Sequence, residues 1–228
     1  MKNKEWYPAE EVVNYIKNTL NVIDYIVSLS LIGGETFAYP ELEIPLNYFI
    51  NSNQIGYIIL TTNGTSYPNN KVLELLTNKK VITTVDNYKA KDPDVYNRLV
   101  NYLKENGCNY ELYDDQHFTD LGRPRKLQNV SEGEMINRFW TCWLPNASEI
   151  IKGEYYRCGR TFSGIDIGLF SKDDVRGDII AISDIKNKNK MKKYIYKEFS
   201  RPYLDTCAAC NSKKDRKVYE AAIQLEDN

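Results

Sequence analysis

Hydrophobic residues in the first half of the chain alternate between helical spacing and short β-branched runs. Helical spacing predicts helices over about residues 8–20, 41–50 and 72–76, and from Asp92-Pro93 to Gly107. The β-branched runs predict strands at Tyr25–Ile32, Ile55–Leu60, Val81–Val85 and residues 108–113, and the first of these is expected to be buried. Strands that alternate with helices in this way indicate βα units and a parallel sheet, so the fold class is α/β.

The pattern changes after about residue 114. Residues 114–131 have the composition of an irregular connection, and Ser131–Trp140 is expected to be a helix because Ser131 and Glu134 have capping-box spacing. Beyond it we expect short strands at Tyr155–Tyr156, Ile165–Leu169 and Ile179–Ile182, and a lysine-rich helix near residues 188–200. The sequence therefore predicts a larger domain over residues 1–138 and a small α+β domain over residues 139–228 with little apolar core of its own.

Composition and charge exclude several classes of function. The 228 residues carry 30 Lys and Arg against 31 Asp and Glu, a net charge of −1 that gives no electrostatic case for binding nucleic acid. No apolar run approaches the roughly 18 residues of a membrane helix, and no basic start is followed by an apolar stretch. We therefore expect a cytoplasmic protein with neither a nucleic-acid nor a membrane partner.

Five cysteines offer the strongest chemical signal. Cys108 begins a predicted strand and is expected to be an ordinary core residue. The other four are Cys142, Cys158 and the C-x-x-C pair Cys207 and Cys210, which can surround one metal centre. Zinc ribbons usually contain two C-x-x-C pairs and only one is present, so the spacing favours a [4Fe–4S] cluster over zinc. Scattered buried thiols are the third alternative.

Polar residues also follow three consecutive predicted strands. They are Gly33-Gly34-Glu35, Thr62-Asn63-Gly64, and Thr83, Thr84 and Asp86. The carboxyl ends of parallel strands meet at one edge of a sheet, where α/β folds bind ligands. Glycines allow a ligand to approach the backbone closely, and the Glu35 carboxylate would suit an ammonium group.

Together, these segments resemble the radical S-adenosylmethionine (SAM) enzymes. The similarity rests on Leu31–Glu35, on Thr61–Thr65 and on the four cysteines. Ten residues separate Cys142 from Gly153, and four separate Gly153 from Cys158. This matches the C-x(9–15)-G-x4-C spacing of the family's twitch or SPASM-type extension. The resemblance implies a partial (β/α)6 barrel that lacks its first strand, followed by a small twitch-like extension with one auxiliary cluster.

The family also implies cofactors and roles for these residues. The methionine ammonium of SAM would meet Gly33, Gly34 and Glu35, while Asn63, Thr83 and Asp86 would lie near its ribose or adenine. In the family, a reduced [4Fe–4S] cluster transfers one electron to SAM, and the resulting 5′-deoxyadenosyl radical takes a hydrogen atom from the substrate. The implied partners are a small-molecule, sugar or peptide substrate and an electron donor such as flavodoxin or ferredoxin.

Two departures from the family pattern change the expectation. Thr36 stands where the family usually has proline, which we expect to be tolerated. The C-x3-C-x2-C loop of the SAM-cleaving cluster is absent, because only residues 1–7 precede the first predicted helix. We therefore expect no SAM cleavage by this chain alone, and favour an incomplete N-terminus. The alternatives are a degenerate, non-catalytic binding or scaffold protein that keeps the C-terminal cluster, and a zinc-stabilised α/β binding domain.

Overall fold

The computed structural model describes residues 6–87, 93–113, 117–119, 125–142, 148–211 and 215–220. The chain divides into two units. The first comprises residues 1–14, 25–118 and 220–228, and the second comprises residues 15–24 and 119–219. This division assigns residues 119–138 to the second unit, whereas the sequence prediction placed the boundary at residue 138.

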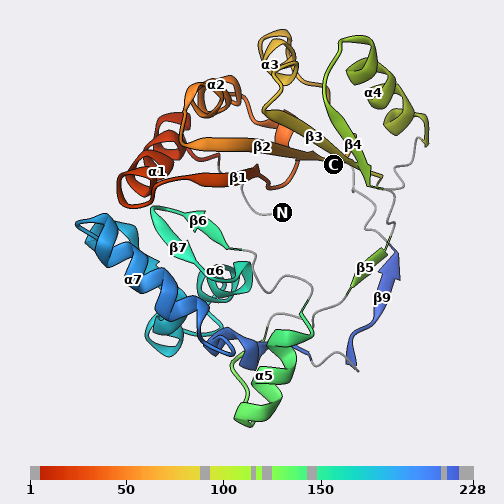
Figure 1. Ribbon diagram of the computed structural model, residues 1–228. Coiled ribbons are helices and arrows are strands. Elements are labelled where there is room, and N and C mark those ends of the chain that lie inside the picture. Colours follow the sequence, from red (N-terminus) through yellow and green to blue (C-terminus); the bar gives the residue numbers. More distant parts are fainter. Residues whose placement is uncertain are drawn as a thin grey trace. The chain divides into compact units, whose positions relative to one another are not determined.

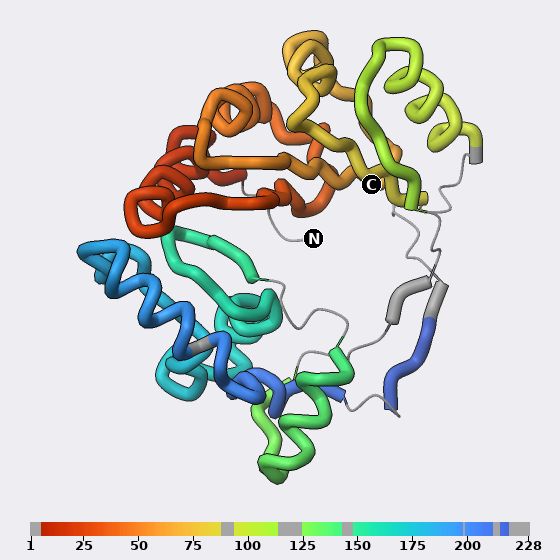
Figure 2. Tube along the Cα trace, viewed as in Figure 1, coloured from red at the N-terminus to blue at the C-terminus, as the bar shows by residue number. Residues whose placement is uncertain are grey.

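A four-stranded parallel sheet forms the centre of the first unit. Its strands are β1 (Ile26–Leu31), β2 (Ile55–Thr62), β3 (Val81–Asp86) and β4 (Tyr110–Tyr113). They lie in the order β1-β2-β3-β4, so strand order follows chain order, as the colour sequence in Figure 2 shows. The four predicted strands and the parallel α/β architecture are confirmed, while a closed or partial barrel stays a prediction.

Helices connect the strands and cover one face of this sheet. The helices of this half of the chain are α1 (Ala9–Val22), η1 (Thr36–Ala38), α2 (Glu43–Asn51), α3 (Asn70–Leu76) and α4 (Pro93–Glu105). α2, α3 and α4 lie on the same side of the sheet (Figure 1). Alternate strand residues such as Ile58, Leu60, Val81 and Val85 are fully buried, which gives these strands their period of two.

The prediction that the first strand is buried is wrong. β1 pairs with β2 alone among the described strands and therefore lies at an edge of the sheet. Val27 is 69% exposed, and Ser28 and Ser30 are exposed as well. Exposed residues therefore lie on both faces of β1, with Val27 on one and Ser28 and Ser30 on the other.

The second unit is a mixture of short elements. Its helices are α5 (Glu132–Trp140), α6 (Gly159–Asp166), α7 (Lys188–Phe199), η2 (Asp173–Asp178), η3 (Ile182–Asp184) and η4 (Asp205–Ala209). Its antiparallel sheet has the order β6-β7-β8, from β6 (Glu149–Ile151), β7 (Glu154–Tyr156) and β8 (Ile179–Ala181). A separate two-stranded sheet joins β5 (His117–Thr119) to β9 (Val218–Glu220).

The glycine of the cysteine spacing has a structural reason. Lys152 and Gly153 form the two-residue connection between β6 and β7, with φ of 52° and 77°. Positive φ at both central residues is the requirement of a type I′ hairpin turn, and it favours glycine. Gly153 therefore sets the hairpin that leads into Cys158.

The small unit contains one described cluster of buried apolar residues. Val22, Ile180, Ile182 and Met191 form it, so the end of α1 packs with β8, η3 and α7. The helices predicted at Ser131–Trp140 and near residues 188–200 are confirmed as α5 and α7, and the strands predicted at Tyr155–Tyr156 and Ile179–Ile182 are confirmed as β7 and β8.

The strand predicted at Ile165–Leu169 is wrong, because α6 occupies residues up to Asp166. The last turn of α6 is closed by hydrogen bonds from Gly168 N to Ile165 O and from Leu169 N to Gly164 O. The alternation of three apolar residues there reflects the end of a helix and its closing turn.

No helix in the described part of the chain is both long and apolar enough to span a bilayer.

Candidate functional site

The Glu35 carboxylate joins the ends of β1 and β2. Its Oε1 accepts hydrogen bonds from Phe37 N at 2.9 Å and from Thr62 Oγ1 at 2.7 Å, and its Oε2 accepts one from Asn63 N at 2.9 Å. Glu35 is 8% exposed. The structure thus brings Glu35 and Asn63 together, but the carboxylate is engaged by its own chain.

Thr36, at the position where the family usually has proline, contributes a second link. Its hydroxyl donates a hydrogen bond to Thr61 O at 2.5 Å, which ties the loop after β1 to the end of strand β2. Gly33 and Gly34 lie between the end of β1 and Glu35, with φ of 136° and 45°, conformations that favour glycine. At either position, no atom lies within 4 Å of the place that an added Cβ would take. The exposed surface at this strand end therefore includes the backbone of both glycines, beside the side chain of Ile32, which is 64% exposed.

Thr83 and Asp86 do not join this cluster through any hydrogen bond among the described residues. Thr83 is fully buried, and its hydroxyl has no hydrogen-bond partner in the described part of the chain. Asp86 lies at the carboxyl end of β3, on the opposite face from Thr83 by strand alternation. Burial raises the pKa of Asp86 above its usual range.

The four cysteines of the second unit line one cavity of about 260 Å³. Cys142 follows α5, Cys158 is the N-cap residue of α6, Cys207 lies within η4, and Cys210 follows η4 directly. Three segments distant in sequence therefore converge on this cavity, and metal binding by their cysteines stays a prediction. Cys108 is 7% exposed and lies in the first unit, which confirms that it is a core residue.

Three of the four thiols in this cavity are strongly desolvated. Burial raises the pKa of Cys158 and that of Cys207 to about 12, and the neighbouring cysteines add to the rise. Burial also raises the pKa of Cys210. Without a positively charged ligand, these thiols are protonated at neutral pH, so binding a metal must release protons.

Three arginines line the same cavity. Arg138 donates from Nη1 to the carbonyl oxygens of Cys207 at 3.2 Å and Ala208 at 3.4 Å, and thereby ties α5 to η4. Arg216 donates to Thr141 O at 2.6 Å, while its Nε is buried without a hydrogen-bond partner among the described residues. Together with Arg160, the positive charges of Arg138 and Arg216 lower the pKa of Cys210 and oppose the effect of burial. Arg138 also pairs through Nε with Glu134 Oε1 at 2.9 Å, and Glu149 lines the cavity as well, so charges of both signs lie around it.

A fourth arginine is buried immediately before Cys158. Arg157 is 1% exposed, and its guanidinium lies over the ring of Phe199 at 3.7 Å. Its Nε and Nη1 are buried without hydrogen-bond partners in the described chain. Arg157 is not among the residues that line the cysteine cavity.

A single metal ion and an iron–sulfur cluster place different demands on four thiolates. Within the described residues, no group of three or more His, Cys, Asp or Glu side chains is arranged to hold one metal ion. A zinc ion requires its four sulfurs at about 2.3 Å from a single point. A [4Fe–4S] cluster spreads four thiolates over four iron atoms, so it requires a wider cavity lined by cysteines.

Several residues of this cavity carry no signal in the sequence. The three arginines and Glu149, whose pKa is raised by burial, come from separate segments without a characteristic spacing. Only their approach in space identifies them.

Comparisons with known proteins add little to this geometry. No protein-family model matches the chain, and no curated protein matches it. Among solved structures, SuiB of Streptococcus suis is similar over 50% of this chain and 29% of its own chain, with 20% sequence identity and a TM-score of 0.41. The chain thus spans less than a third of that protein, and a likeness at this level carries no inference about function.

Proposed function

We propose that this chain is a radical-SAM-type protein whose second unit holds an auxiliary [4Fe–4S] cluster through Cys142, Cys158, Cys207 and Cys210. The observation that supports the proposal is the convergence of these four cysteines on one cavity that arginines also line. Four thiolates around a cluster carry a net negative charge, and Arg138, Arg160 and Arg216 supply positive charge beside them. When bound, such a cluster supplies one-electron transfer.

The first unit contributes the SAM part of the proposal. Gly33 and Gly34 offer exposed backbone for the methionine end of SAM, and Glu35 holds that loop against β2. In this proposal Glu35 orients the loop, whereas Asn63 and Asp86 lie nearer the nucleoside. Thr83 is too deeply buried for direct contact. SAM cleavage by this chain alone is not part of the proposal, and a small-molecule, sugar or peptide substrate and a flavodoxin or ferredoxin partner remain proposals from the family resemblance.

The cluster is tested by anaerobic purification with iron and sulfide analysis. We expect about four iron and four sulfide per chain. Cys207→Ala and Cys210→Ala should each abolish the visible absorption of the cluster and lower the melting temperature of the second unit, because the metal takes the place of a core there.

Cys108→Ala is the matched control, since it removes a buried cysteine that lies outside the cavity. It should retain wild-type iron. Colourless protein with one zinc per chain would establish the zinc-stabilised domain instead. Wild-type protein without any metal would refute both assignments.

A further inference from the structure

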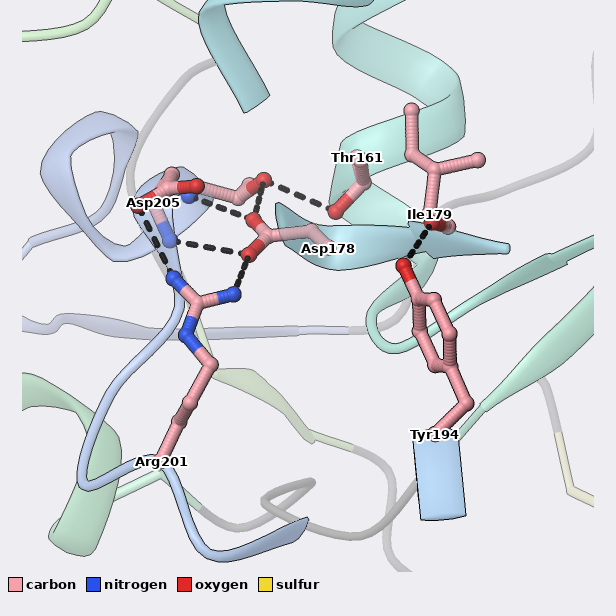
Figure 3. A network of polar contacts seen from close by, with 7 residues as sticks. Thr161, Asp178, Ile179, Tyr194, Arg201 and Asp205 are labelled. Carbon is pink, nitrogen blue, oxygen red and sulfur yellow. Dashed lines mark hydrogen bonds and ion pairs between the residues drawn. The ribbon is translucent and has the colours of Figure 1, made fainter. Parts of the chain in front are cut away.

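Asp178 is a fully buried carboxylate with four hydrogen-bond donors around it. Its Oδ2 accepts hydrogen bonds from Thr206 N at 2.8 Å and from Thr206 Oγ1 at 2.7 Å. Its Oδ1 accepts from Asp205 N at 3.0 Å and from Arg201 Nη1 at 3.2 Å. Figure 3 shows this carboxylate between η4 and the guanidinium of Arg201, which also binds Asp205 at 2.9 Å.

The same residue holds the segment that leads into Cys158. The main-chain oxygen of Asp178 accepts a hydrogen bond from Arg157 N at 3.0 Å. Thr206 Oγ1 lies 2.8 Å from Thr161 Oγ1, in the first turn of α6. Because the single hydroxyl proton of Thr206 is donated to Asp178, Thr161 is the donor in that pair.

The network therefore connects two of the three segments that supply cysteines. Thr206 is the residue before Cys207, and Arg157 is the residue before Cys158. Nearby, Tyr194 Oη donates a hydrogen bond to Ile179 O at 3.0 Å, which links α7 to β8, the strand that follows Asp178 (Figure 3).

A buried carboxylate specifies geometry because it is costly unless all its donors are in place. Asp178 is 0% exposed, and burial raises the pKa of its carboxyl, while the hydrogen bonds from Thr206 counteract part of that rise. Displacing η4 from α6 would separate the carboxylate from its partners. The distance between Cys158 and Cys207 is consequently restrained without any metal.

We infer that Asp178 is a positioning residue for the cysteine cavity, which sets the spacing between Cys158 and Cys207 for the incoming cluster. This inference rests on the proposed function. The carboxylate acts through the backbone of η4 and through Thr206, and is not itself a metal ligand. Outer partners of metal ligands commonly change metal affinity by about 10-fold to 100-fold when they are replaced.

The test compares iron release to a chelator from anaerobically reconstituted wild-type protein and from Asp178→Asn. The asparagine keeps the shape but turns an amide donor toward backbone donors, so we expect iron to leave about tenfold faster. The EPR spectrum of the reduced cluster should change as well, which a loss of stability alone would not produce. Asp173→Asn is the matched control, because Asp173 forms an exposed ion pair with Arg176 on the same short helix, and it should behave as wild type.

The outcomes separate the two claims. A folded Asp178→Asn variant with wild-type iron release and EPR spectrum would overturn the positioning role and leave the cluster assignment intact. If Asp178→Asn does not fold, Thr161→Val decides, since it removes the hydrogen bond between Thr206 and α6 and leaves the carboxylate all four of its donors. Faster release supports the inference, and an unchanged rate overturns it. Wild-type protein that binds no iron would remove the proposed function and this inference together.

Discussion

Replacing Glu35 distinguishes a structural carboxylate from one held ready for a ligand. Glu35→Ala removes the acceptor of three buried hydrogen bonds, from Phe37 N, Thr62 Oγ1 and Asn63 N. Each donor left unpaired costs about 1–3 kcal/mol, and water entering the space recovers part of that loss. We therefore expect the free energy of unfolding of the unliganded protein to fall by about 3–5 kcal/mol.

Glu35→Gln should lower the free energy of unfolding by less than Glu35→Ala does, because one of its side-chain groups can still accept hydrogen bonds. The retained carbonyl oxygen can replace Oε1, which accepts from Phe37 N and Thr62 Oγ1, while the new amide group faces Asn63 N. One charged acceptor is lost and two donors oppose each other, for an expected cost of about 2 kcal/mol.

The assay is urea unfolding followed by circular dichroism, combined with hydrogen exchange of the β2 amides, because the two units need not unfold together. Glu105→Gln, at the exposed end of α4, is the matched control and should stay within about 0.5 kcal/mol of wild type. A carboxylate kept free for an ammonium group would make the unliganded variants as stable as wild type. That result, or equal stability of the two Glu35 variants, would refute the reasoning.

Two further predictions concern the packing of α2 and the pairing of α7. Leu46→Ala should lower the free energy of unfolding by about 2–5 kcal/mol because Leu46 is 0% exposed. Ile44, on the same helix, is 44% exposed, so Ile44→Ala should cost less than about 1 kcal/mol. Equal losses of the two variants in chemical denaturation would contradict the packing of α2. Asp24 has its pKa lowered to about 2 by hydrogen bonds from two lysines of α7, so the stability it contributes is present above its ordinary pKa of 3.8 and is lost as pH falls toward 2. The difference in melting temperature between wild type and Asp24→Asn should therefore shrink in acid and in high salt, and a difference independent of pH would exclude this pairing.

The sheet of the first unit could be predicted because its signals are local. Each strand carries an apolar run, and α3 has a local cap, Asn69, whose side chain accepts a hydrogen bond from Val72 N. The exposure of β1 could not be predicted in the same way. It depends on which strand lies at the edge of the sheet, and strand order is a property of the whole fold.

Only part of the candidate site could be predicted from the sequence. Cysteine spacing predicts which thiols can meet, since few residue types bind soft metals. The role of Glu35 could not be read from its sequence position, because its partners lie on the next strand, 27 and 28 residues away. Asp178 lies 28 residues before Thr206 and carries no motif, so only the structure identifies it.

Several polar side chains of the second unit are buried, although apolar side chains such as Phe139 and Leu204 line the cysteine cavity. The side chains of Arg157, Thr161, Asp178 and Thr206 are almost fully buried. The apolar cluster of this unit consists of other residues: Val22, Ile180, Ile182 and Met191. Buried polar groups of this kind contribute little net stability even when they are fully hydrogen-bonded, but they restrict the backbone to one arrangement. In the proposed function, a metal centre bound by four thiolates would supply stability to this unit. The polar network would then fix the positions of the cysteines and the cluster would stabilise that arrangement, so the two contributions would be complementary.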